Sequence, residues 1–94
     1  MLKKVKIYNV FRDLNHNDRL ILACKIVDGV IEIGDTLLTK SGQMIKIIDV
    51  ELNPSYNEAN LIINSNTLDK KNIKLSELIN KEIKICSDDF NTPS

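Results

Sequence analysis

The sequence predicts an all-β protein that folds as a small closed barrel of about six or seven short strands. Apolar runs of strand length recur at close spacing, and glycine-containing turns separate them. Helical periodicity is confined to one short turn near residues 75–80. Closure into a barrel also hides the edges that short apolar strands would otherwise expose. A chain of 94 residues suits one domain, which we expect at 1–87, followed by a polar, frayed tail at 88–94.

The first half of the chain contains four strand candidates. The second of them is almost continuously apolar, as is typical of a strand that is covered on both faces. Asp28 and Gly29 follow it directly, and Asp-Gly between two apolar runs is a strong hairpin signal. The next four residues are therefore expected to return as a strand. The candidates are 4–11, 20–27, 30–33 and 36–39.

The second half contains the longest strand candidate and two shorter ones. Pro54 has no amide hydrogen to donate and should end the long strand. A single helical turn follows in the segment KLSELIN, where apolar residues recur at i, i+3 and i+4. Asn80 is expected to end it as a left-handed residue. The strand candidates are 44–52, 59–64 and 82–86.

The formal net charge is zero, so the chain as a whole gives no reason to expect nucleic acid or an anionic membrane as partner. The charges are unevenly distributed, however. Basic residues dominate up to Lys25, whereas acidic residues dominate from Ile26 to Asn60. We find no leader-like stretch and no apolar run of about 20 residues, and expect a cytoplasmic protein. The acidic residues of the second segment are Asp28, Glu32, Asp35, Asp49, Glu51 and Glu58, against Lys40 and Lys46.

Residue types that support catalysis or metal binding are scarce. His16 is the only histidine and lies in a polar loop, where such a residue is normally solvated. Cys24 and Cys86 lie in separate apolar runs without the spacing of a zinc site, and their pairing is not decided by the sequence. The glycines are too dispersed to form a phosphate-binding loop. We therefore expect no enzyme activity, no cofactor and no metal.

The segments GVIEIGDTLL and MIKIIDVEL resemble the second domain of elongation factor Tu and related translational GTPases. The resemblance covers about Val5 to Ile85 and implies a β-barrel of that type, here without a GTPase domain. In that family the barrel packs against the GTPase domain, so the resemblance implies one face built for protein contact. The residues that follow the family order are Gly29, Ile31, Ile33, Gly34, Asp35, Leu37, Gly42, Ile45, Ile48, Val50 and Glu51.

The sequence departs from the family where elongation factor Tu holds the 3′ end of aminoacyl-tRNA. Asn17-Asp18-Arg19 stands in place of Gly-Arg-Gly, and Asp28 stands in place of an arginine. A lost glycine blocks close approach, and a carboxylate repels a phosphate. The resemblance therefore implies the scaffold and not the binding of tRNA.

Three interpretations remain open at this stage: a protein-binding module, an RNA- or ribosome-associated barrel, and a subunit of a homo-oligomer. The first would use a rim of loops in which the sequence departs most from the family. The second needs basic residues gathered on one face, and its binding should weaken with salt. The rim residues are Asn17, Asp18, Arg19, Asp28, Gly29 and Asp35. The basic residues are Lys3, Lys4, Lys6, Arg12, Arg19 and Lys25.

Overall fold

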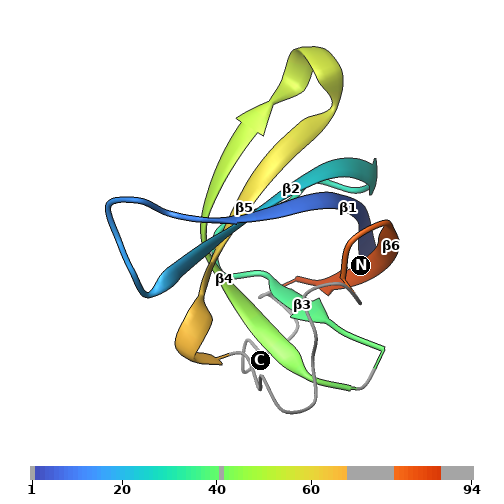
Figure 1. Cartoon of the computed structure of the whole chain (residues 1–94). Coiled ribbons are helices and arrows are strands. Elements are labelled where there is room, and N and C mark those ends of the chain that lie inside the picture. The colour runs from blue at the N-terminus through green and yellow to red at the C-terminus, as the bar shows by residue number, and fades with distance from the viewer. Residues whose placement is uncertain (1, 41, 68–77, 88–94) are drawn as a thin grey trace.

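The computed structural model describes residues 2–40, 42–67 and 78–87, which form a closed antiparallel barrel. The strands follow one another around the barrel in the order β1-β2-β5-β4-β3-β6 (Figure 1). The last strand, β6, thus lies between the first and the third and closes the ring. The all-β barrel predicted from the sequence is confirmed.

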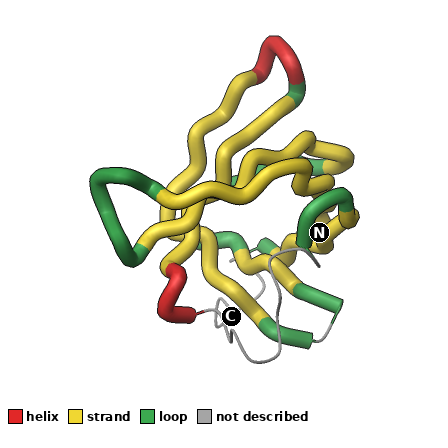
Figure 2. The backbone as a smooth tube through the Cα atoms, in the orientation of Figure 1, coloured by secondary structure: helices red, strands yellow, loops and turns green. Residues whose placement is uncertain are grey.

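The described residues contain six strands and two short 3-10 helices. The strands are β1 (Leu2–Arg12), β2 (Arg19–Asp28), β3 (Thr36–Leu38), β4 (Met44–Asn53), β5 (Glu58–Asn64) and β6 (Lys81–Cys86). The 3-10 helices, η1 (Pro54–Tyr56) and η2 (Ser65–Thr67), lie at the two ends of β5 (Figure 2).

Alternation along each strand decides which side chains fill the barrel. In β1 the apolar side chains of Val5 and Ile7 are fully buried, whereas Lys6 between them is exposed. Burying a side chain of this size stabilises the fold by roughly 1.5–3 kcal/mol relative to exposure. The other strands contribute Leu20, Leu22, Cys24, Leu37, Ile45, Ile47, Ala59, Leu61, Ile63, Ile83 and Ile85, and Ile31 and Leu78 from outside the strands join the same core.

Two hairpins extend beyond the closed ring (Figures 1 and 2). One joins β1 to β2, and the other joins β4 to β5 and carries η1 at its tip. The second hairpin projects because β3 is short. β3 pairs with β4 only as far as Lys46, while β4 continues beside β5 as far as Asn53.

Residues 30–33 do not form the strand that the Asp-Gly signal predicts, so that prediction is wrong. Gly29 does adopt a left-handed conformation, with φ of 81°. However, β2 already pairs with β1 on one side and with β5 on the other, so no edge of β2 remains for a returning strand. The chain instead continues toward β3, burying Ile31 and leaving Val30 and Ile33 exposed.

Two predictions about where secondary-structure elements end can be compared with the structure. Pro54 follows the last residue of β4, as expected. Asn80 has a left-handed φ of 65°, as expected, and its N–H donates to the carbonyl of Ile7 at 2.6 Å. Residues 75–77 of the predicted helical turn and the predicted tail at 88–94 lie outside the described residues.

Candidate binding surface

The rim predicted from the sequence is divided between the two ends of β2. Asn17 and Asp18 belong to the loop that precedes β2, and Arg19 is its first residue. Asp28 is its last residue, and Gly29 follows. A strand of ten residues spans about 30 Å, so these groups do not form one contiguous surface.

The sixth rim residue, Asp35, is buried and paired with Lys3 (Nζ–Oδ2 distance 2.6 Å). Only 8% of the Lys3 side chain and 1% of the Asp35 side chain are exposed. The Asp35 Oδ2 atom also accepts the backbone N–H of Glu32 at 2.9 Å. Both charges are therefore part of the interior and are not available to a partner.

The predicted basic face is interrupted by acidic side chains. Lys4 pairs with Glu82 at 3.6 Å, and the strand register places Lys6 between Lys25 and Glu82. Lys25 in turn lies opposite Glu58. Together with the burial of Lys3, this arrangement leaves no uniformly basic surface over these strands.

Arg12 and Arg19 lie away from these lysines. Arg12 lies near the β1–β2 loop and opposite Leu20, while the paired lysines lie toward the other end of β1. Neither arginine therefore joins these lysines on one basic face.

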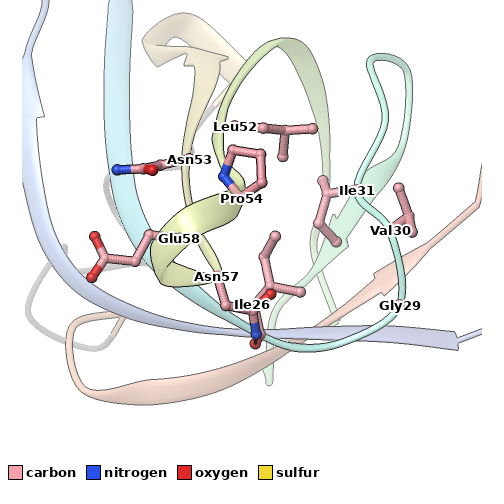
Figure 3. Close-up of a pocket in the computed structure, with 9 residues that line it drawn as sticks. All are labelled: Ile26, Gly29, Val30, Ile31, Leu52, Asn53, Pro54, Asn57 and Glu58. Carbon is pink, nitrogen blue, oxygen red and sulfur yellow. Dashed lines mark hydrogen bonds between the residues drawn. The ribbon is translucent and has the colours of Figure 1, made fainter.

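An apolar pocket with a volume of about 200 Å³ lies between the β4–β5 hairpin and the segment after β2. Leu52 and Pro54 lie on the hairpin side, Val30 and Ile31 lie opposite, and Ile26 lies between them (Figure 3). A small-molecule site typically has a volume of about 300–1,000 Å³, so this pocket suits one or two side chains. Its lining is completed by Gly29, Asn53, Asn57 and Glu58.

Local hydrogen bonds hold the hairpin wall in place. Asn57 adopts a left-handed φ of 56° at the end of η1, and its N–H donates to the carbonyl of Pro54. Its side-chain amide donates to the carbonyl of Ile26 at 2.7 Å, and its own carbonyl accepts the Ile26 N–H at 2.9 Å. The hairpin tip is thereby fixed to the end of β2, and the pocket is preformed.

Two of the large apolar side chains that line this pocket are exposed. Val30 is 64% exposed and Leu52 is 51% exposed, and both line it. Val27 and Tyr56, which are also exposed, neighbour lining residues in the sequence. Apolar side chains gathered around a concavity are typical of an interaction site. The sequence does not reveal this site, because the patterns around Leu52 and Val30 are those of ordinary strands.

The outer face of the same hairpin has a second, polar pocket of about 350 Å³. Tyr8 and Glu51 line it, and it shares Leu52, Asn53 and Glu58 with the apolar pocket. The Tyr8 hydroxyl donates to Glu58 at 3.2 Å. Loss of hydration, and then the charge and hydrogen bond of Glu58, raise the pKa of Tyr8 above its ordinary value of 10.0. The phenol therefore remains a neutral donor at physiological pH.

The thiol of Cys24 is not available for chemistry. Its side chain is fully buried, and that burial raises the pKa of Cys24 to about 12. Cys24 and Cys86 are both free cysteines. His16 is exposed in the β1–β2 loop. Among residues 2–40, 42–67 and 78–87, no three His, Cys, Asp or Glu side chains are grouped so that they would hold a metal ion.

No protein family, curated protein or solved structure matches this chain. Within the part of the chain that the structure describes, no helix has the length and apolar character needed to cross a membrane.

Proposed function

We propose that the barrel is a non-enzymatic protein-binding module whose partner contacts the apolar pocket beside the β4–β5 hairpin. The observation that supports this function is the exposure of Val30 and Leu52 on facing walls of a preformed pocket. Covering such side chains contributes roughly 25 cal/mol per Å² of apolar surface removed from water. The pocket volume suits side chains of a protein better than a cofactor.

We also propose that the barrel is related to the second domain of elongation factor Tu-like GTPases. The ordered positions of Gly29, Gly34 and Asp35 in the sequence support this relationship. In that family the barrel packs against a GTPase domain, which is consistent with a role in protein contact. We further propose a cytoplasmic location, where the free thiols of Cys24 and Cys86 would be stable.

Photo-crosslinking in cytoplasmic extract tests this function. A photoreactive amino acid replaces Val30, and its crosslinks are compared between the wild-type background and Leu52→Asp. Leu14→Asp provides the matched control, because Leu14 is 96% exposed in the β1–β2 loop at the far end of β2. Both substitutions are on the surface, and each should change the melting temperature by less than about 4 °C.

We expect the wild type and Leu14→Asp to crosslink the same protein, whether or not the extract is treated with nuclease, and Leu52→Asp to lose this crosslink. A second copy of this chain is one such partner, and its mass would identify it. Equal crosslinking in all three proteins would refute the assignment of this surface. Recovery of RNA or ribosomes that is abolished by nuclease or salt would support the alternative function instead.

A further inference from the structure

Among the residues that the structure describes, nothing pairs with one edge of the outer half of β4, and the two pockets lie on either side of this edge. β3 pairs with β4 only through Lys46, and Ile47 is bonded to the residues just before β3. From Ile48 to Asn53, the described residues provide a pairing strand on the β5 side only. An uncovered strand edge is a template for pairing with another chain.

The direction of the backbone groups along this edge follows from the bulge in β4. Ile47 donates its N–H to Asp35 and accepts from Gly34, so its polar groups point toward the β3 side. One extra residue lies between Ile47 and the next paired position. Because backbone groups alternate in direction along a strand, those of Val50 and Leu52 also point away from β5.

The two positions differ in how this edge is protected. The Val50 N–H donates to Oδ1 of Asp49 at 2.9 Å, so the adjacent carboxylate blocks it. The described residues include no such side-chain acceptor for the N–H of Leu52. Leu52 also lines the apolar pocket, so the open backbone position and the apolar cavity coincide.

A strand paired with this edge would send its side chains alternately into the two pockets. The residue opposite Leu52 lies on the same face of the sheet as Leu52, toward the apolar pocket. Its two neighbours point to the outer face, where Glu51 and Glu58 line the polar pocket. Glu32 adds another exposed carboxylate just beyond the opposite wall. The geometry thus combines one apolar position with flanking positions that favour cations.

We infer that the partner contributes an extended, basic segment that adds to the free edge of β4 in antiparallel orientation. An apolar side chain enters the pocket at Leu52, and flanking Lys or Arg side chains lie beside Glu51 and Glu58. This inference rests on the proposed function, because it describes the partner of the same surface.

Three capped synthetic peptides test the inference by NMR titration of the full chain. The first is Lys-Val-Lys-Val-Lys, the second replaces lysine with glutamate, and the third carries N-methylated valines. The valine opposite Leu52 would donate its own N–H to the Leu52 carbonyl, so methylation removes this hydrogen bond. Amide hydrogen exchange at Leu52 is measured at saturation with the first peptide.

We expect the lysine peptide to bind at least about tenfold more tightly than the glutamate peptide and about fivefold more tightly than the methylated one. Exchange at Leu52 should slow by at least about tenfold. Glu51→Gln should weaken binding by about threefold, whereas Glu82→Gln, an equal loss of charge on β6, should leave it unchanged.

Absence of binding by the lysine peptide, or equal binding of all three peptides, would overturn the inference. The crosslinking experiment separates this failure from that of the proposed function. If Leu52→Asp abolishes the crosslink but no preference for the lysine peptide exists, the surface binds protein in another manner. If Leu52→Asp leaves the crosslink intact, both the function and the inference fail.

Discussion

Removal of either charge of the buried Lys3–Asp35 pair should destabilise the barrel far more than removal of an exposed charge. Lys3→Met leaves the Asp35 carboxylate without the ammonium group at 2.6 Å. Asp35→Asn retains an oxygen that can accept the Glu32 N–H but leaves the Lys3 charge uncompensated. We consider these two variants and their combination.

The size of the expected loss in stability follows from the burial of the pair. Breaking a buried pair by removing one partner costs about 3–5 kcal/mol, because the remaining charge stays in a poorly solvated site. For a domain of this size, 3 kcal/mol corresponds to a decrease in melting temperature of roughly 12 °C or more. The double variant removes both charges and leaves neither unpaired. It should therefore be at least as stable as the less stable of the two single variants. The resulting coupling between the two positions, which is the sum of the two single costs minus the cost of the double variant, is expected to be about 3 kcal/mol or more.

Urea unfolding followed by circular dichroism measures the three free energies of unfolding. Lys4→Met provides the matched control, because Lys4 pairs with Glu82 at 3.6 Å while its side chain is 41% exposed. An exposed pair contributes at most about 1 kcal/mol. The reasoning is refuted if the Lys3 and Asp35 variants cost no more than this control. It is also refuted if their effects add within about 0.5 kcal/mol.

Three further predictions concern local features. Gly29→Ala should lower the free energy of unfolding, measured in urea, by at least about 1 kcal/mol more than Gly42→Ala. Both glycines have a positive φ, but only at Gly29 would the added Cβ collide with a neighbour, Lys3 Cγ at 2.7 Å. Equal costs would contradict the contact. Alkylation of Cys24 at pH 8, followed by mass spectrometry, should be much slower in folded than in urea-unfolded protein. Folding raises the pKa values of Cys24 and Tyr8, so their neutral forms stabilise the fold at a pH below the ordinary pKa values of these groups. This stabilisation is lost as the pH rises through the raised values, so the free energy of unfolding should decrease between pH 9 and about pH 12. The decrease should be less steep in Cys24→Ala. An unchanged slope would exclude that thiol as the cause.

The fold could be predicted because its determinants are local. Period-two alternation identifies the inward residues of β1 and β6, and Pro54 and Asn80 end elements through their own backbone properties. The failure at residues 30–33 has a nonlocal cause. An Asp-Gly turn can form a hairpin only if the preceding strand has a free edge, and both edges of β2 are occupied by strands from other parts of the chain.

The sequence carries a signal for the burial of Lys3, which the predicted rim and basic face did not take into account, but none for the apolar pocket. Lys3 has the same parity as Val5 and Ile7, so alternation alone places it on the inward face and calls for a buried acidic partner. The apolar pocket had no such signal. It depends on the register that brings the end of β4 close to residues that follow β2, and pairing across strands fixes that register.

The position of β6 in the ring has a consequence for how the chain folds during synthesis. β6 pairs with residues near the start of the chain in β1 and with β3, although it is the last of the described strands to leave the ribosome. Until residues 81–86 emerge, the edges of β1 and β3 that β6 will cover have no partner. Closure must then join segments that are distant in sequence, which makes it a slow, late step. Nascent chains that stall before this strand should therefore be the form most exposed to strand pairing between molecules.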